Sequence, residues 1–166
     1  MPHLGGTFSH RYIWYILTPL LTNVNDTESE LHVTPLYFAV NAGEVDCVKM
    51  LLNRGASVNA GRVMSILHIA VANQEHDNSH IIEMLLQKGA NPNSIDLDGA
   101  RPINYASGKY GLEYIRLLIK YGADVNAKDM HGKTVLYRIN HHVGMNGYMN
   151  MPKQSRELLI RNGARE

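Results

Sequence analysis

The sequence predicts an all-α solenoid, in which helix-turn-helix units stack side by side and loops project from the stack. Three observations lead to this prediction. A six-residue pattern occurs four times, a second pattern ending in Gly-Ala follows each copy, and the copies are spaced 31, 36 and 33 residues apart. Two patterns that alternate in order at this spacing are typical of stacked repeats.

The first pattern opens each unit and occupies residues 34–39 (TPLYFA), 65–70 (SILHIA), 101–106 (RPINYA) and 134–139 (TVLYRI). In the first copy, Thr34 can accept a hydrogen bond from the free amide groups of a helix, and Pro35 has a φ that suits the first turn. Leu36 and Ala39 share one helix face, and the small alanine lets another helix approach closely. We therefore expect a short helix to begin in each copy.

The second pattern closes each unit and occupies residues 51–59 (LLNRGASVN), 85–93 (LLQKGANPN), 118–126 (LIKYGADVN) and 159–164 (LIRNGA). Val48, Leu51 and Leu52 recur at i, i+3 and i+4, which predicts a second helix with one apolar stripe. Gly55 follows, where a left-handed residue ends a helix at little steric cost.

Together, the two patterns resemble the ankyrin repeat family over roughly residues 34–164, since the first approximates that family's Thr-Pro-Leu-His-x-Ala signature. The resemblance implies an ankyrin repeat domain over residues 34–166, with repeats at about 34–60, 65–94, 101–127 and 134–166. Tyr37 and the stretch 46–48 (DCV) are also similar to ankyrin proteins that recruit substrates to ubiquitin ligases through a SOCS box, and similar arrays occur in poxviruses.

Residues 1–33 are expected to form a degenerate N-terminal half-repeat that caps the stack. Aligned without gaps, residues 11–25 lie over residues 45–59, with Leu17 on Leu51 and Asn25 on Asn59. Terminal units of solenoids are commonly atypical. The apolar run at residues 12–17 is too short to span a bilayer and Pro19 follows it, so we expect no membrane insertion.

Composition narrows the classes of partner. The chain has 166 residues, 45% hydrophobic content, a net charge of +1 and a pI of about 7.9, which argues against a nucleic-acid binder. Its single cysteine, Cys47, cannot form an internal disulfide, which fits a reducing compartment. We expect a monomer in the cytoplasm or nucleus.

No constellation of catalytic residues emerges from the sequence, so we expect neither an enzyme nor a bound cofactor or metal. Among nine histidines, the pairs His76 with His80 and His141 with His142 are the alternatives for a metal site, but neither has a supporting cysteine. His68 occupies the histidine position of the repeat signature, where we expect a structural hydrogen bond. The glycines at 108 and 111 lack the spacing of a phosphate-binding loop.

Departures from the pattern indicate irregular units. The second unit has three extra residues within the polar stretch 73–80, and the fourth has eight extra residues around Gly144, Gly147 and Pro152. We expect a flexible or functional loop within 140–157. Ile139 replaces the small alanine, so the last repeat is predicted to pack less regularly.

The resemblance implies that a protein partner docks on the concave face, where loop tips and the ends of first helices line up. Family positions that vary between members carry over to Arg62, Met64, Leu97, Asp98, Met130, His131 and Lys133 in the loops, and to Asn73, Lys109 and His141 at the helix ends. Met64, Leu97 and Met130 are expected to be exposed apolar side chains, as in a protein-binding surface. The alternative is that these are ordinary loop residues with scattered apolar exposure.

The resemblance also marks Asn59, Asn93 and Asn126, which stand where ankyrin asparagines are hydroxylated; the structural alternative is a hydrogen bond to the backbone of the neighbouring loop. We expect a non-enzymatic protein-protein interaction module, a scaffold or adaptor. The alternative is the substrate-recognition part of a ubiquitin ligase adaptor. No SOCS-box or F-box segment follows Ala164, so such a role requires a longer product.

Overall fold

The computed structural model describes residues 23–25, 33–59, 64–141 and 153–165. Within these ranges the chain forms eight helices in four consecutive pairs: α2 (Pro35–Asn41) with α3 (Val45–Asn53), α4 (Ile66–Ala72) with α5 (Ser79–Gln87), α6 (Pro102–Tyr105) with α7 (Gly111–Lys120), and α8 (Val135–Asn140) with α9 (Lys153–Arg161).

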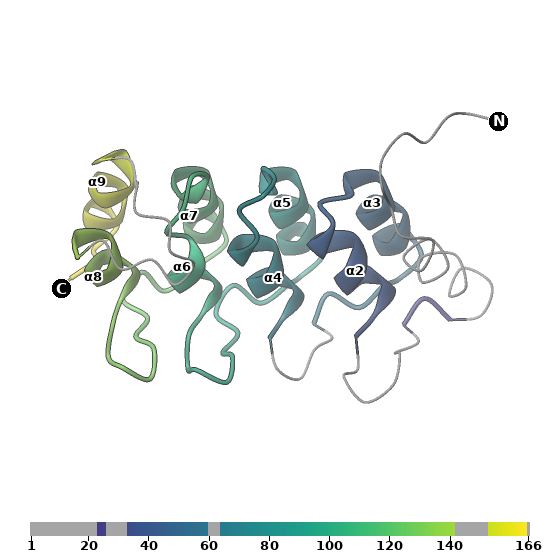
Figure 1. Cartoon of the computed structure of the whole chain (residues 1–166), viewed down its shortest axis with the longest axis horizontal. Helices are drawn as coiled ribbons and strands as arrows, with labels where there is room; N and C mark the ends of the chain where they lie inside the picture. Colours follow the sequence, from purple (N-terminus) through teal and green to yellow (C-terminus); the bar gives the residue numbers. More distant parts are fainter. Residues whose placement is uncertain (1–22, 26–32, 60–63, 142–152, 166) are drawn as a thin grey trace.

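The pairs stack side by side along the molecule (Figure 1). The first helices α2, α4, α6 and α8 form one row, the second helices α3, α5, α7 and α9 form another, and the loops between units project from one edge. Each first helix packs on the next one along its row, and the second helices do the same. The prediction of an all-α solenoid of helix-turn-helix units is confirmed.

The first helices begin where the first pattern predicts. The Thr34 hydroxyl accepts a hydrogen bond from the Tyr37 amide at 3.3 Å, and Thr134 does the same for Tyr137 at 3.0 Å. Arg101 is not a capping residue, and there the Asn104 side chain instead accepts from the Arg101 amide at 2.9 Å. Each cap satisfies an amide that has no partner within its helix.

The second helices end at glycines with positive φ: +84° at Gly55, +87° at Gly89, +87° at Gly122 and +86° at Gly163. After Gly89, the Ala90 amide returns to the Leu85 carbonyl at 3.0 Å and closes the helix. No atom lies within 4 Å of a Cβ built on any of these four glycines, so backbone conformation alone selects glycine there.

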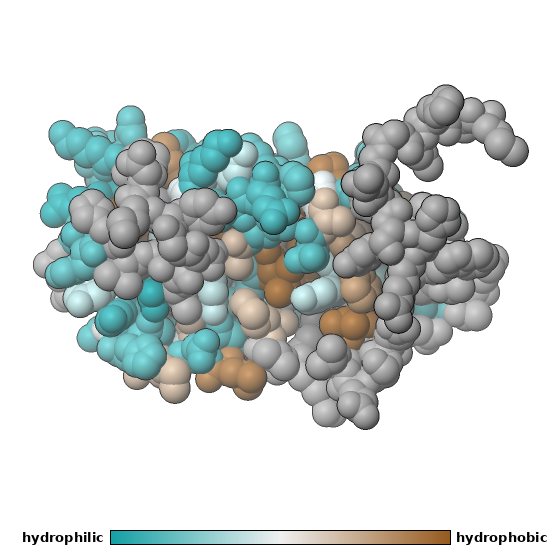
Figure 2. Space-filling view, viewed as in Figure 1, coloured by the Kyte–Doolittle hydropathy of each residue, from teal (hydrophilic) through white to brown (hydrophobic). Residues whose placement is uncertain are grey.

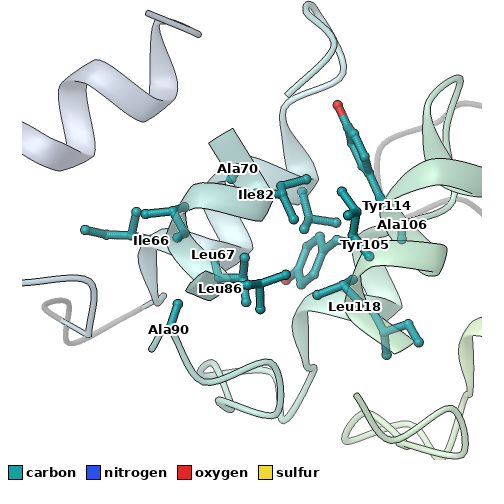
Figure 3. Packing of buried hydrophobic residues seen from close by; sticks show 14 of the residues in the cluster. Ile66, Leu67, Ala70, Ile82, Leu86, Ala90, Tyr105, Ala106, Tyr114 and Leu118 are labelled. Carbon is teal, nitrogen blue, oxygen red and sulfur yellow. The ribbon is translucent and has the colours of Figure 1, made fainter. Parts of the chain in front are cut away.

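One continuous core runs between the two rows. Leu67 on α4, Ile82 on α5 and Leu118 on α7 are fully buried and belong to the same cluster. Figure 3 shows Tyr105, Ala106 and Tyr114 of the third unit packed beside side chains of the second. Because each unit buries its apolar surface against its neighbours, the stack as a whole supplies the core.

The third and fourth units differ from the simple pattern. Helix α6 has only four residues, because the chain leaves helical geometry at Ala106 and continues into Ser107 and Gly108. In α8, Ile139 is buried although it replaces a small alanine. Gly144, Gly147 and Pro152 lie outside the described residues. The loop expected within 140–157 ends earlier than predicted, because α9 begins at Lys153.

Most of residues 1–33 also lies outside the described ranges. Asn25 is described, and its side chain donates to the Gly55 carbonyl at 3.2 Å and accepts from the Ser57 amide at 2.7 Å. Asn59 makes the corresponding pair of bonds in the next unit. This repetition supports the N-terminal half-repeat, which stays a prediction.

Candidate functional site

Two of the projecting loops are held by buried aspartates. We name residues 94–101 the third finger and residues 127–134 the fourth finger. Asp96 Oδ1 accepts from the amides of Asp98 and Ala100, both at 2.9 Å. Asp129 Oδ1 accepts from the amides of His131 at 2.8 Å and Lys133 at 2.9 Å. Each carboxylate therefore fixes the backbone of its own finger tip.

The second carboxylate oxygen of each aspartate binds a side chain of the helix that follows the finger. The Tyr105 hydroxyl donates to Asp96 Oδ2 at 2.6 Å, and the Arg138 guanidinium pairs with Asp129 Oδ2. Tyr105 and Arg138 occupy the same position of the first pattern, so two different side chains perform one task. Each finger is thus anchored to its own helix.

These contacts shift the pKa values of the groups involved. Burial, followed by the hydrogen bond to Asp96, raises the pKa of Tyr105 well above its usual range. For Asp129, burial opposes ionisation, but hydrogen bonds from the Lys133 amide, Arg138 and the His131 amide outweigh it and lower the carboxyl pKa. Tyr105 therefore stays a donor, and Asp129 stays ionised.

The tips of the two fingers lie together and carry exposed apolar side chains. The Met130 amide donates to the Asp98 carbonyl at 2.9 Å, which joins the fingers. Exposed fractions are 61% for Ile95, 71% for Leu97 and 63% for Met130. Figure 2 shows apolar atoms at the tip of the third finger and over the middle of the first-helix row.

Polar and charged residues accompany these apolar side chains on the two fingers. Asp98 and His131 are exposed. Lys133 is half-buried, with its Nζ 5.5 Å from the centre of the Tyr137 ring. Arg62, the basic residue proposed for the second loop, lies outside the described residues.

Met64 does not behave as predicted. Its side chain is half-buried and packs against the hydrophobic core, whereas the sequence suggested an exposed apolar residue on a loop tip. Met64 lies immediately before Ser65, the residue that caps α4, so it lies at the base of the loop rather than at the tip. Its exposed part faces the pocket described below.

Two of the three residues predicted at the ends of first helices lie there: Asn73 follows α4 and His141 follows α8. The prediction for Lys109 was wrong, because α6 ends at Tyr105 and Lys109 lies in the turn before α7. Asn73 is half-buried, and its amide donates to the Asn41 carbonyl at 2.7 Å, linking α4 to α2. Lys109 is exposed, with Nζ 4.9 Å from the centre of the Tyr110 ring. His141 stacks on Tyr137 at 4.1 Å between ring centres.

An open pocket of about 500 Å³ lies on the first-helix row, between the fingers and the helix ends. Its lining combines apolar side chains with three side-chain amides and one carboxylate: Asn41, Met64, Ile69, Ala72, Asn73, Gln74, Glu75 and Tyr105. Of these, the sequence predicted Asn73 and Met64 as site residues. For Ile69 and Tyr105, the sequence signal was an apolar residue at the fifth position of the first pattern.

The three asparagines of the second pattern tie neighbouring units together. Asn93 donates to the Gly122 carbonyl and accepts from the Asp124 amide, both at 2.8 Å. Asn59 and Asn126 make the same two bonds to the backbone that follows Gly89 and Gly163. The sequence predicted a hydrogen bond to the backbone of the neighbouring projecting loop, but the bonds reach the glycine turn that ends the second helix of the next unit. Hydroxylation stays a prediction.

The environments of His68 and Cys47 indicate structural rather than catalytic roles. His68 is buried, and its Nε2 lies 3.1 Å from the Ala100 carbonyl, as expected for the signature histidine. Cys47 is half-buried, and burial with nearby Glu44 and Asp46 raises the pKa of its thiol. In the part of the chain that the structure describes, no group of three His, Cys, Asp or Glu side chains could hold a metal ion.

None of the described helices is long and apolar enough to cross a bilayer.

Comparison with known proteins agrees with this geometry. The family model of ankyrin repeats in three copies matches residues 13–96 and 67–142. The B-cell lymphoma 3 protein homolog of Mus musculus is 34% identical over 104 residues, 63% of this chain and 23% of that protein. Human ankyrin repeat and SOCS box protein 6 is 31% identical over 120 residues, 68% of this chain and 28% of that protein.

An ankyrin repeat protein of fowlpox virus is 41% identical over 78 residues, 47% of this chain and 52% of that protein. The chain spans about a quarter of the length of the mouse and human relatives. Ankyrin repeats are protein-protein interaction modules and are generally non-enzymatic. With the family model matching most of its length, the chain belongs to the ankyrin repeat family.

Proposed function

We propose that this chain binds a partner protein through the surface formed by the first-helix row and the finger tips, which is the concave face in the family. The observation that carries this proposal is the pocket on the first-helix row together with exposed Ile95, Leu97 and Met130 on the joined third and fourth fingers. Exposed apolar side chains beside charged ones, on a backbone held rigid, are typical of a protein-binding surface.

The rigidity of the fingers strengthens the proposal. Asp96 and Asp129 fix the finger tips and anchor them to α6 and α8, so a partner binding there does not need to order the loops. Pre-ordered loops leave more of the interaction energy for affinity. A loop that only connects two units would need neither this anchoring nor exposed apolar side chains at its tip.

Affinity capture from cell extract tests the proposal. The native chain is compared with the double variant Leu97→Ser and Met130→Ser, in which two exposed side chains change and the core does not. We expect partners captured by the native chain to be lost with this variant, because the few central residues that carry most of an interface's binding energy each cost about 1 kcal/mol or more when truncated, roughly fivefold or more in affinity. Met64 is left unchanged because it packs against the core.

The matched control is the double variant Val45→Ser and Ile160→Ser. These residues are also exposed apolar side chains, 39% and 44% exposed, but they lie on α3 and α9 in the second-helix row. Capture should survive in this control. Loss of the same partners with both double variants, or with the control alone, would place the binding surface elsewhere.

A second candidate function is substrate recognition for a ubiquitin ligase. Its support is the similarity to ankyrin repeat and SOCS box proteins, including human protein 11, which is 38% identical over 110 residues. In this case the chain is part of a longer product. Co-purification of cullin or elongin-type subunits with that longer product would favour this role, and capture of partners without them would favour the simpler module.

We also propose that the chain works as a monomer in the cytoplasm or nucleus, without nucleic acid. A net charge of +1 gives little attraction for phosphate backbones, and a single cysteine suits a reducing compartment. Light scattering of the purified chain and fluorescence imaging of the tagged native protein test these two points.

A further inference from the structure

We infer that the pocket on the first-helix row binds an extended peptide segment of a partner, in which an apolar side chain lies within two residues of a lysine or arginine. This inference rests on the proposed function and adds the chemistry of the partner. It follows from the walls of the pocket, from its charge and from one side-chain amide that is left available.

The apolar part of the pocket suits a side chain rather than a flat surface. Ile69 and Ala72 on α4, Tyr105 on α6 and Met64 at the base of the loop contribute to its lining. Tyr105 is buried, whereas Met64, Ile69 and Ala72 are half-buried and offer partly exposed apolar surface. An apolar side chain that enters there removes surface from water on both partners, which is the main source of affinity at such sites.

The negative charge of the pocket favours a positively charged side chain on the partner peptide. Glu75 is the one ionisable acid or base among the lining residues besides the phenol of Tyr105. Glu75 is exposed, and among the described residues no ion pair to it is found within 4.0 Å. A lysine or arginine of the partner, placed beside the apolar side chain, would meet this carboxylate.

The amides of the pocket differ in what they can still bind. Asn73 donates to the Asn41 carbonyl and accepts from the Glu75 amide, and Gln74 donates to the Val71 carbonyl and accepts from the Tyr110 amide. Within the described part of the chain, no hydrogen bond is found for the side chain of Asn41, which is exposed. This amide can donate to and accept from the main chain of an extended segment.

Lys109 provides a test of the predicted charge preference, because its charge is opposite to that of Glu75. Gln74 accepts from the Tyr110 amide, and a Cβ on Gly108 would collide with the Gln74 side chain, so residues 108–110 lie against the pocket wall. Lys109 therefore stands near the pocket with a charge opposite to that of Glu75. Neutralising the two residues should move the affinity for a basic peptide in opposite directions.

The experiment uses a displayed library of random 12-residue linear peptides, selected on the folded native chain. The variant Ala72→Leu, which places a larger side chain in the pocket and keeps a good helix former in α4, is held back for the titrations that follow. We expect the selected peptides to share an apolar residue within two positions of a lysine or arginine. Peptides without this combination, or no selectable peptide at all, would overturn the inference.

A selected peptide is then titrated against single variants. We expect about a tenfold or greater loss with Ala72→Leu, a two- to fivefold loss with Glu75→Gln, and a higher affinity with Lys109→Gln. The control Gln87→Leu places an exposed leucine at the end of α5, away from the pocket lining, and should bind like the native chain. Circular dichroism and thermal melting show that each variant is folded.

Two results separate this inference from the proposed function. Peptides that bind Ala72→Leu as well as the native chain, but are lost with the Leu97→Ser and Met130→Ser variant, would overturn the pocket as the peptide site while leaving the protein-binding surface in place. Peptides that are insensitive to both variants would contradict both proposals.

Discussion

At the scale of single residues, the glycines that end the second helices show how conformation alone can fix residue type. Gly89 has φ of +87° and open space where a Cβ would be. A substitution there is strained by its backbone angle and not by a collision. The same residue accepts the side-chain hydrogen bond of Asn59, so a change in its geometry also reaches the preceding unit.

Gly89→Val is therefore expected to lower the free energy of unfolding by about 1 to 2 kcal/mol or more, since L-residues resist the left-handed region and β-branched ones most strongly. Gly89→Asn is the matched variant and should lose less, because asparagine tolerates positive φ. Urea titrations measure both. Equal losses would show that the backbone angle is not what selects glycine.

His68 links the second and third units and responds to pH. Burial lowers its pKa below the ordinary value of 6.5, against smaller opposing effects from the Ala100 carbonyl and Asp96. The unfolded chain therefore takes up a proton at higher pH than the folded chain does. The contribution of His68 to stability is complete above pH 6.5 and decreases as pH falls from there toward the folded-state pKa.

His68→Asn should reduce this loss. Asparagine occupies the same position in the third unit, where Asn104 accepts from the Arg101 amide and donates to the Ala127 carbonyl at 3.1 Å. Urea titrations at pH 7.5 and pH 5.5 should show a smaller decrease for the variant than for the native chain. An identical decrease would mean that His68 does not carry the pH dependence.

At the scale of elements, each finger depends on one aspartate and on one side chain of the following helix. The Asp129 and Arg138 side chains are 1% and 6% exposed, so removing the cation leaves a buried carboxylate without its partner. In the third finger the partner of Asp96 is the neutral hydroxyl of Tyr105. The two fingers should therefore differ in how much they depend on this contact.

Arg138→Leu should lower the free energy of unfolding by about 3 to 5 kcal/mol, the usual cost of breaking a buried ion pair. Tyr105→Phe should cost about 1 to 3 kcal/mol, since one hydrogen bond to a buried acceptor is lost. Thermal or urea unfolding measures both. The double variant Arg138→Leu with Asp129→Asn should regain part of the loss; no recovery would mean that the buried charge is not the cause.

At the scale of the whole molecule, stability should depend on position in the array. Leu85 and Leu159 are both fully buried at the same position of the second pattern. Helix α5 has a neighbouring unit on each side, whereas the packing described for α9 is on α7 and α8. The loss from a central residue therefore involves two interfaces between units.

Leu85→Ala is expected to cost about 2 to 5 kcal/mol, and Leu159→Ala less. Urea titrations that follow helix content by circular dichroism give both values. A loss for Leu159→Ala equal to that for Leu85→Ala would contradict the prediction that the last unit packs less regularly.

The stack could be predicted from the sequence because its determinants are local and repeated. Thr34 begins a helix and Gly55 ends one through contacts within a few residues, and the same logic recurs in each unit. The finger tips Leu97 and Met130 were found for the same reason. Met64 was misplaced because its contact with the core depends on tertiary packing, which the repeat pattern does not show.

The pocket could not be predicted in the same way. Asn41, Gln74 and Tyr105 belong to three different units and come together only when those units stack. Tyr105 and Arg138 share a repeat position and a task, yet nothing in their chemistry suggests this until their contacts with Asp96 and Asp129 are known. Contacts of this kind depend on how far apart the stacked units lie in space, and the repeat pattern in the sequence determines this distance only approximately.

The most direct test of the protein-binding surface is site-specific photo-crosslinking in cell extract, with a photoreactive amino acid placed at Leu97, at Asn73 or at Val45. Leu97 and Asn73 lie on the proposed surface, and Val45 is an exposed residue of the second-helix row. We predict crosslinked partner proteins from Leu97 and Asn73 and none from Val45. Crosslinks from Val45 with none from the other two positions would contradict the account.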